Sequence, residues 1–485
     1  MRHLTVHLLN FHLLLSVFSI YIGTSFQFGY NIGSLNPIKK HIENFYFEQT
    51  NSSSKWYFTI CTAIGVFGTI IGGMCVGYLS DTFGRKRTVM ISQIVGVIGG
   101  VIQYLSYPFN SYWILPIGRL ITGWHCGIGA QIAPMYVSEF SPFKIRGVLV
   151  TVHQLMITFG IVVASLYGLD SIFGTKYRWS YLLLMNIVPS IVCLIMMIKI
   201  PESPRYLMIT KNDEQKATKS MQFYRESDNV KSDIDEMSVE IKTSKLIPEF
   251  KIIQLFTSRN LLIPLIMAVS MQYIQQLSGI NMIFFYSHEL FSGIISKNYI
   301  QYAILLTSII NMIAVIPSVF LTDKLGRKPL IFYPIAGMII CMSIVCTLNS
   351  YITPDSLNGI AKEIINSTNS ILSIFSITFI LIYVILFEFG LGPIPFILGS
   401  ELFTQGPRST AMSISGFSNS LFTLLVSIIV PPIQEKIGEK VFIIFIINCA
   451  IFNVIFYFFF PETKNKSFEE ISKIFSKKDR KQIEN

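Results

Sequence analysis

Twelve long apolar stretches are the feature that most limits what this chain can fold into. A helix needs about 20 apolar residues to cross the ~30 Å hydrocarbon core of a membrane. Hydrophobic residues make up 51% of the 485 and charged residues only 14%, an excess that soluble domains do not show. The sequence therefore predicts an all-α membrane protein with twelve transmembrane helices. We expect these spans near residues 11–35, 57–80, 88–108, 113–138, 147–170, 179–200, 260–290, 300–322, 330–349, 371–400, 409–432 and 440–460.

A charged, helix-prone stretch at residues 201–258 divides these spans into six and six. We predict an N-terminal six-helix bundle over residues 1–200 and a C-terminal six-helix bundle over residues 259–462. Residues 201–258 are then a helical linker, and residues 463–485 a tail. Both are expected on the cytoplasmic side.

Short motifs repeat in the same order in the two halves. Each motif follows the same span of its half, at a similar separation from its partner. Three ordered repeats indicate a duplicated six-span unit, and we expect the active centre to lie between the two copies. The repeats are Asp81/Arg85 with Asp323/Arg327, Glu139/Arg146 with Glu401/Arg408, and Pro201-Glu202-Ser203 with Pro461-Glu462-Thr463.

The distribution of positive charge indicates orientation rather than nucleic-acid binding. The net charge is +10, but the lysines and arginines lie in loops between spans and no folded basic domain is present. Most of them lie on the side that holds both termini and the middle loop, which favours cytoplasmic termini. Asn51-Ser52-Ser53 is a glycosylation acceptor in the first external loop, so Asn51 is a candidate modification site.

Three amide side chains lie in the stretch Gln275–Asn281 of the seventh span, at Gln275, Gln276 and Asn281. An amide in hydrocarbon costs several kcal/mol unless it has a partner, so this group implies a polar cavity or ligand, or contacts with neighbouring helices. On a straight helix Asn281 would point away from the other two. We therefore predict that this span bends or unwinds near Ser278-Gly279.

The tenth span contains the run Gly390-Leu391-Gly392-Pro393-Ile394-Pro395. Two prolines and two glycines remove helical hydrogen bonds and permit bending. Such a bend suits either a gate that closes on a substrate or a static kink.

Sequence motifs of enzymes and metal sites are missing. The seven cysteines lie in apolar runs without metal-ligand spacing, so we interpret them as packing residues. No Gly-x-Ser-x-Gly elbow, His-Glu-x-x-His helix or phosphate-binding loop occurs. We expect no enzyme activity, no metal and no cofactor.

Several motifs, taken together and in order, resemble those of sugar porters of the major facilitator superfamily, and in particular of animal-type facilitative glucose transporters. The resemblance covers nearly all twelve spans. It implies two pseudo-symmetric six-helix bundles and transport of a hexose by alternating access. The motifs are Gln27-Phe28-Gly29-Tyr30-Asn31, Gly118-Arg119-Leu120, Pro134-Met135-Tyr136, His153-Gln154-Leu155, Pro201-Glu202-Ser203-Pro204-Arg205, the Gln275–Asn281 stretch, Gly392-Pro393-Ile394-Pro395, Gln405-Gly406-Pro407-Arg408 and Pro461-Glu462-Thr463.

The resemblance also implies which residues bind the sugar. Amides suit a ring of hydroxyls because they donate and accept hydrogen bonds without a charge to desolvate. The chain departs from the family at Phe396 and Ser420, where tryptophan is common, and at Thr423, where asparagine is common. The implied sugar contacts are Gln154, Gln275, Gln276, Asn281, Asn311, Glu388 and Asn419, with Phe396 as an aromatic contact.

The repeated charged residues are expected at cytoplasmic ends of spans, where opposite charges can pair across helices. One surface ion pair contributes only about 0–1 kcal/mol, so each could also be a solvated helix end. Their repetition and the family resemblance favour a latch that closes the cytoplasmic side and parts during transport. The set is Asp81, Arg85, Glu139, Arg146, Glu202, Arg205, Asp323, Arg327, Glu401 and Arg408.

Proton-coupled relatives place an aspartate after the Phe-Gly-Tyr run of the first span, where this chain has Asn31. An amide does not titrate near neutral pH, so we predict passive uniport. His125, His153 and His288 could titrate instead, which keeps proton symport as an alternative. A sugar sensor that does not transport is a further one.

The expected partners are a small hexose and membrane lipid, with no nucleic acid. The expected location is the plasma membrane. We expect a monomer to be sufficient for transport.

Overall fold

The computed structural model describes residues 10–52, 55–142, 145–246, 252–292, 295, 299–351, 360–403 and 405–462. Their regular structure is entirely helical, and the chain divides into two compact units, Met1–Pro248 and Glu249–Asn485. We call these unit 1 and unit 2. The boundary lies within the predicted linker, and the predicted tail at 463–485 lies outside the described residues.

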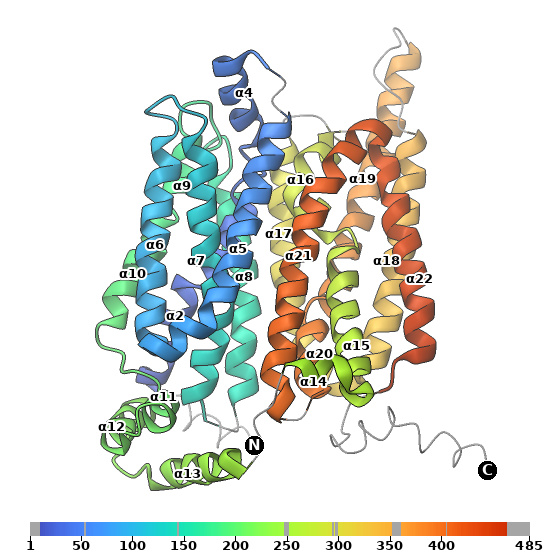
Figure 1. Ribbon diagram of the computed structural model, residues 1–485. Coiled ribbons are helices and arrows are strands. Elements are labelled where there is room, and N and C mark those ends of the chain that lie inside the picture. Colours follow the sequence, from blue (N-terminus) through green and yellow to red (C-terminus); the bar gives the residue numbers. More distant parts are fainter. Residues whose placement is uncertain are drawn as a thin grey trace, which may run out of the picture. The chain divides into compact units, whose positions relative to one another are not determined.

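Unit 1 is a bundle of long helices with a group of shorter ones, α11 to α13, at one end (Figure 1). These three helices occupy most of the predicted linker. The helices of unit 1 are α2 (Phe11–Gly23), α3 (Ser25–Gly33), α4 (Lys39–Thr50), α5 (Lys55–Phe83), α6 (Arg85–Leu105), α7 (Ile114–Phe140), α8 (Arg146–Tyr167), α9 (Trp179–Leu184), α10 (Ile187–Met197), α11 (Pro204–Ile209), α12 (Glu214–Arg225) and α13 (Lys231–Leu246).

Unit 2 is a second bundle, which begins with the short helix α14 beside the start of α15. Its helices are α14 (Ile253–Thr257), α15 (Arg259–Gln276), α16 (Ile280–Ser292), α17 (Ile300–Leu325), α18 (Arg327–Tyr351), α19 (Ile360–Phe389), α20 (Ile394–Glu401), α21 (Gln405–Ile437), the 3-10 turn η2 (Gly438–Lys440) and α22 (Val441–Phe459).

Eleven segments of the described chain are helical, long and apolar enough to cross a membrane by length and composition. They correspond to eleven of the twelve predicted spans. Four of them are pairs of consecutive helices: α2 with α3, α9 with α10, α15 with α16, and α19 with α20.

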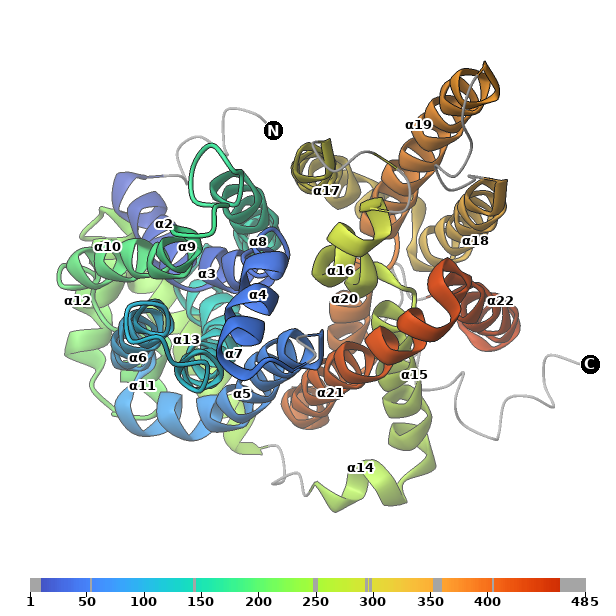
Figure 2. The same ribbon diagram turned by 90° about the horizontal axis from the view of Figure 1, so that it is seen from above.

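The remaining predicted span, at 113–138, is the helix α7. It has 27 residues but is less apolar, because it carries Arg119, His125 and Gln131. It packs against α3, α5, α6 and α8, so most of its surface faces protein (Figure 2). An interior helix can carry polar residues at a lower cost than a helix that faces lipid.

Glycines allow α7 and α5 to approach closely. A Cβ atom at Gly123 would lie 2.0 Å from the carbonyl oxygen of Gly65, and one at Gly127 would lie 2.1 Å from that of Thr69. Small residues at such positions bring helix backbones together, which is how membrane helices gain packing contacts.

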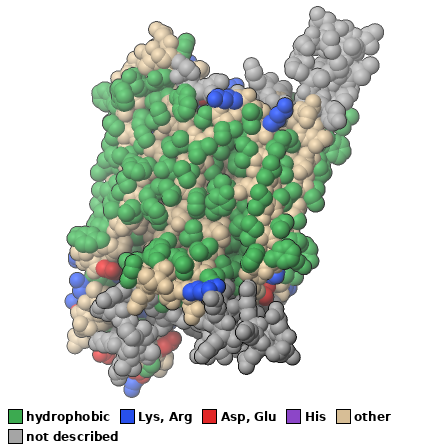
Figure 3. All heavy atoms as spheres, turned by 45° about the vertical axis from the view of Figure 1, so that its right-hand side comes forward, with side chains coloured by type: hydrophobic (Ala, Val, Ile, Leu, Met, Phe, Trp, Pro, Cys, Tyr) green, Lys and Arg blue, Asp and Glu red, His purple; other side chains and the backbone are tan. Residues whose placement is uncertain are grey.

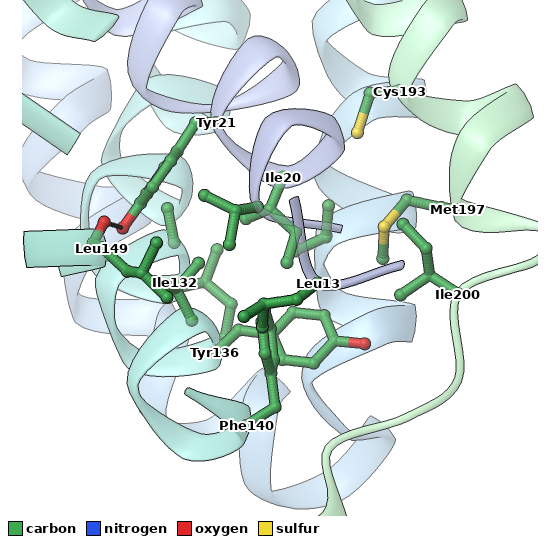
Figure 4. Packing of buried hydrophobic residues seen from close by; sticks show 14 of the residues in the cluster. Leu13, Ile20, Tyr21, Ile132, Tyr136, Phe140, Leu149, Cys193, Met197 and Ile200 are labelled. Carbon is green, nitrogen blue, oxygen red and sulfur yellow. Dashed lines mark hydrogen bonds between the residues drawn. The ribbon is translucent and has the colours of Figure 1, made fainter. Parts of the chain in front are cut away.

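The core of unit 1 forms where four helices meet (Figure 4). Leu13 and Ile20 of α2 pack with Ile132 and Tyr136 of α7 and with Cys193 of α10. The Tyr21 hydroxyl donates a hydrogen bond to the carbonyl oxygen of Leu149 in α8, at 2.9 Å. All seven cysteines are free thiols, which agrees with their interpretation as packing residues.

The outer surface carries large apolar side chains. On α22, Ile443, Ile447, Ile451, Val454 and Phe458 are all exposed and follow one another at intervals of three or four residues. This spacing places them along one side of a helix. The face in Figure 3 shows hydrophobic side chains across its middle and charged side chains toward its ends, as expected of a surface in contact with lipid.

Replacement of Gly123 by alanine tests the close packing of α5 and α7. The added Cβ meets backbone, which cannot move aside, so we expect the free energy of unfolding to fall by about 1–3 kcal/mol. The measurement is the Tm of the purified protein in detergent. Gly77→Ala is the control, because a Cβ there meets nothing within 4 Å. An unchanged Tm in Gly123→Ala would show that the helices do not pack as closely as described.

Candidate functional site

The seventh span is broken at its centre. Helix α15 ends at Gln276 and α16 begins at Ile280. Gly279 between them has φ +100°, a backbone conformation that glycine adopts readily and other residues rarely do. A Cβ there would also lie 3.0 Å from the ring of Phe445. The bend predicted near Ser278-Gly279 is therefore confirmed.

Side chains from other helices bind the carbonyl groups at this break. The hydroxyl of Tyr383 in α19 donates to the carbonyl oxygen of Ser278 at 3.0 Å. The side-chain amide of Asn448 in α22 donates to the carbonyl oxygen of Leu277 at 3.1 Å. These two carbonyl groups are thus bound by side chains of the protein, as such groups need to be inside a membrane.

The tenth span is also broken, within the glycine- and proline-rich run. Helix α19 ends at Phe389 and α20 begins at Ile394. The side-chain amide of Gln275 donates to the carbonyl oxygens of Leu391 and Gly392, at 2.7 and 3.1 Å. The expected bend is present, and Gln275 satisfies the carbonyls that it exposes.

Five amides join into one hydrogen-bonded set, which we call the amide network: Gln272, Gln275, Gln276, Asn281 and Asn419. Asn419 donates to the side-chain oxygens of Gln272 and Gln275 at 2.7 and 2.6 Å. Gln276 donates to Gln275 at 3.3 Å, and Asn281 donates to Gln276. The structure therefore brings together four of the predicted sugar contacts.

Hydrogen-bonding capacity differs within the amide network. Gln275 uses both N–H groups on the carbonyls of the tenth span and both lone pairs of its oxygen on Asn419 and Gln276, so its capacity is filled. Gln276 and Asn281 each make fewer bonds to the described residues. Gln275 is therefore an organising residue, and Gln276 and Asn281 are better suited to bind a ligand.

Gln272 was missed by the sequence analysis. It lies on α15, one helical turn before Gln275 and Gln276, and its side chain is buried. Residues three and four apart share a helix face, so its spacing from the predicted contacts is the signal that could have identified it.

Other predicted contacts of unit 2 lie outside the amide network. Asn311 of α17 is 1% exposed, and its side-chain oxygen has no hydrogen-bond partner among the described residues. Glu388 of α19 is buried, and a Cβ at Gly392 would lie 2.7 Å from its carboxylate. Phe396 of α20 is 50% exposed, which leaves half of its surface available to lipid or ligand.

The predicted contact of unit 1, Gln154, lies on α8 and is half-buried. The residue before it, His153, has its Nδ1 atom 2.6 Å from the hydroxyl oxygen of Ser25 in α3. The position of α8 at Gln154 is thus tied to the first span.

Asn31 binds the buried arginine of unit 1. Arg119 donates to the side-chain oxygen of Asn31 at 3.2 Å, and Asn31 donates to Asn186 at 3.1 Å and to the carbonyl oxygen of Gln27 at 2.9 Å. Among the described residues no carboxylate pairs with Arg119. The partner of the cation is therefore an uncharged amide.

Charged residues of unit 1 form a cluster at the start of α6. Arg85 binds Glu139 of α7 through its Nε and a terminal nitrogen, at 3.0 and 2.9 Å. Glu202 accepts hydrogen bonds from the backbone nitrogens of Arg85 and Lys86, at 2.9 and 3.0 Å. Gly84 has φ +92° and leaves no room for a Cβ, which would lie 2.3 Å from Glu202.

Unit 2 repeats this cluster at the start of α18. Arg327 binds Glu401 of α20 at 2.5 and 3.1 Å. Glu462 accepts from the backbone nitrogens of Arg327 and Lys328, both at 2.9 Å. Gly326 has φ +88°. The duplicated motifs therefore build the same local structure, a carboxylate at a helix N-terminus where it satisfies free N–H groups.

These ion pairs join different helices. Asp81 is a minor partner of Arg85, at 3.4 Å with its side chain 74% exposed. Burial raises the pKa of the Glu202 carboxyl, and its bonds from backbone N–H groups oppose that rise. Arg146 begins α8 and Arg205 lies in α11. The side chains of Asp323 and Arg408 lie outside the described part of the chain.

Comparison with known proteins identifies the family. The family "Sugar (and other) transporter" matches residues 17–475. The chain belongs to this sugar transporter family. It is therefore an integral multi-pass membrane protein of a family of transporters, not of enzymes, and its relatives make a sugar substrate plausible.

Individual relatives agree with this assignment. The chain is 35% identical over 475 residues to facilitated glucose transporter member 3 of solute carrier family 2 from Ovis aries, covering 95% of this chain and 92% of the relative. It is similar in structure to the inward-open xylose transporter from E. coli, with a TM-score of 0.78, 24% identity, and coverage of 96% of this chain and all of that one.

A second solved structure is the major facilitator superfamily proton:xylose symporter bound to 6-bromo-6-deoxy-D-glucose. It has a TM-score of 0.74 and 22% identity, and the match covers 96% of this chain and 99% of that one. The major facilitator fold expected from the sequence is therefore confirmed.

Tyr383→Phe tests the hydrogen bond at the break of the seventh span. It removes only the hydroxyl, so the buried carbonyl of Ser278 loses its donor and we expect a loss of about 1–3 kcal/mol in stability. Hydrogen exchange of residues 277–283 should rise at the same time. Tyr333→Phe, at a residue 70% exposed, is the control. Unchanged exchange at the break would mean that the hydroxyl does not hold it.

Proposed function

We propose that this protein is a facilitative hexose uniporter of the glucose type that works by alternating access. The relative from Ovis aries is a facilitated glucose transporter, which supports the choice of substrate and of mechanism. The observation that carries the proposal is the amide network of unit 2, a set of uncharged side chains that are buried or half-buried.

The chemistry of these side chains suits a sugar. Hexose hydroxyls both donate and accept, and an amide offers both functions without a charge to desolvate. Gln276 and Asn281 have unused hydrogen-bonding groups that a ligand can bind. The side-chain oxygen of Asn311, which has no partner among the described residues, needs a hydrogen-bond donor. A sugar hydroxyl can supply that donor. On this proposal Gln154 of unit 1 contributes a further contact, and Phe396 covers an apolar face of the sugar.

Uniport rather than proton symport is supported by Asn31. An amide that binds Arg119 gains and loses no proton near neutral pH. Symport is the second candidate and a sensor the third. Neither has an observation of this structure in its favour.

The charged clusters have a mechanical role in this proposal. Each joins the ends of three chain segments within one unit, through Arg85 with Glu139 and Glu202, or Arg327 with Glu401 and Glu462. The sequence favoured a latch that parts during transport. Because each pair lies within one unit, we propose instead that the clusters keep each unit rigid while access alternates. We further propose that both clusters and both termini are cytoplasmic and that the protein is in the plasma membrane. Asn51, exposed at the end of α4, would then be external and open to glycosylation.

Uptake of labelled D-glucose into proteoliposomes tests the proposed function. Saturable counterflow without accumulation driven by an acid-outside pH gradient is expected. Acid-driven accumulation would establish symport instead. Binding without flux would establish a sensor, and neither binding nor flux would exclude a glucose substrate.

Gln276→Leu tests the predicted sugar contact. We expect glucose flux at low substrate concentration to fall about tenfold or more, because one or more hydrogen bonds to the sugar are lost at about 1.4 kcal/mol per factor of ten. Asn453→Leu is the matched control, since Asn453 is a buried amide of unit 2 whose bond goes to the carbonyl of Phe332. Undiminished flux in Gln276→Leu at equal protein abundance would remove Gln276 from the site.

Asn31→Asp tests the absence of a proton carrier. A carboxylate there forms an ion pair with Arg119 that protonation neutralises. We expect the initial rate of the variant to lie below wild type near pH 7.5 and to rise as the pH falls toward about 5, within the range that a perturbed carboxyl reaches. Asn31→Gln controls for loss of the amide geometry. A profile parallel to that of wild type would show that position 31 does not take part in the rate-limiting step.

A further inference from the structure

The first span is broken as well, between α2 and α3. Helix α2 ends at Gly23, and Thr24 has φ −122° and ψ −76°, outside the helical range. The side-chain amide of Gln93 in α6 donates to the freed carbonyl oxygen of Gly23, at 2.7 Å. This carbonyl is deep in unit 1, where it needs such a donor.

Gln27 of α3 is the centre of the hydrogen bonds around this break. Its amide nitrogen donates to the side-chain oxygen of Gln93 at 3.2 Å and to the hydroxyl of Ser190 in α10 at 2.6 Å. Its amide oxygen lies 2.6 Å from Nε2 of His125 in α7. Gln27, Gln93, Ser190 and His125 are all buried, so one side chain joins four helices.

The direction of these bonds fixes the form of His125. Because the nitrogen of Gln93 is used on Gly23, its oxygen faces Gln27, and the oxygen of Gln27 must then face His125. Nε2 of His125 therefore carries the proton. Nδ1 lies 2.8 Å from the hydroxyl oxygen of Ser92, which is also 3.2 Å from the carbonyl oxygen of His125. In the neutral form with Nε2 protonated, Nδ1 accepts from this hydroxyl. Neutral His125 satisfies both neighbours.

The half-helix α3 that this arrangement holds lies directly against α8. A Cβ at Gly29 would lie 1.8 Å from the carbonyl oxygen of Ile157, and one at Gly160 would lie 2.1 Å from that of Phe26. Ser25, the first residue of α3, binds His153, which precedes Gln154. A displacement of α3 is thus transmitted to the backbone that presents Gln154.

From this geometry we propose that Gln27 is a positioning residue for Gln154, with His125 and Gln93 holding Gln27 in place. The inference rests on the proposed sugar site, to which it adds residues that do not touch the sugar. Gln27 acts by fixing α3 after the break of the first span, and α3 in turn fixes α8 at Gln154.

The test compares transport and binding in matched variants. In Gln27→Leu and His125→Leu we expect KM and Kd for D-glucose to rise about tenfold, because the geometry at Gln154 is lost, while kcat changes less. His125→Gln should keep most of the affinity, since its amide nitrogen can take the place of Nε2 and donate to Gln27. If any packing defect at position 125 were enough to raise KM, His125→Gln would raise it as well and would not restore the affinity.

Gln103→Leu is the control for loss of a buried amide. Gln103 is on the same helix as Gln93 and bonds to Thr122, with its nitrogen 2.9 Å from that hydroxyl. We expect its Tm to fall with KM unchanged. Equal KM values in Gln27→Leu, His125→Leu and wild type would overturn the inference. So would a tenfold rise in Gln103→Leu, because the effect would then be one of general packing.

Hydrogen exchange of α3 and α8 gives a readout that needs no sugar. His125→Leu should raise exchange at residues 25–33 and 150–158, and His125→Gln and Gln103→Leu should not. If wild type neither transports nor binds glucose, the proposed function fails, and the exchange data still decide whether Gln27 fixes α8. Unchanged exchange in His125→Leu overturns the inference, including in the case where Gln27→Leu does not fold.

Discussion

The need to satisfy backbone carbonyl groups at broken helices governs how the polar side chains of this protein are arranged. Within a membrane no water is available to bind such a group, and each one left unpaired costs several kcal/mol. Four spans of the described chain are broken, and at three of the breaks a side chain from another helix binds a freed carbonyl group. Gln93 binds Gly23 O, Tyr383 binds Ser278 O, and Gln275 binds the carbonyls after Phe389.

This constraint changes how the amides of the seventh span are interpreted. Binding to neighbouring helices and binding to a sugar are usually weighed as alternatives for the same residue. Here they divide between adjacent residues. Gln275 uses all of its hydrogen-bonding groups on the tenth span, on Asn419 and on Gln276. Gln276 and Asn281 are held in place by these bonds and still have unused hydrogen-bonding groups. A rigid amide loses less entropy when it binds a ligand.

The sequence predicted those features that depend on one segment at a time. The break at Gly279 followed from the directions of three amides on one helix, and the bend in the tenth span from its prolines and glycines. The fold class followed from the apolar stretches, and these include α7, which is less apolar than the other spans and is surrounded by protein.

Features that depend on several helices could not be predicted in the same way. The group around Gln27 draws Ser92, Gln93, His125 and Ser190 from three other helices. None of these stands in a periodic pattern that marks it. The partner of Arg85 is likewise Glu139, more than 50 residues away in the sequence, while the nearby Asp81 is mostly solvent-exposed.

The duplication has kept the helix ends alike and let the centres of the spans diverge. Gly84 and Gly326 share the same positive φ, and each is followed by a helix whose first N–H groups bind a glutamate. A Cβ at either glycine would meet that carboxylate. The glycine and the glutamate are therefore required together at the start of the helix. The breaks at Gly23 and Gly279 are also tight, since a Cβ there would lie 2.4 Å from Sγ of Cys193 or 3.0 Å from the ring of Phe445. The groups that bind their carbonyl oxygens, however, are amides and hydroxyls from different helices. The ends of the spans therefore carry the same charged groups in both units, whereas their centres carry different polar groups, and it is among those groups that a ligand can be bound.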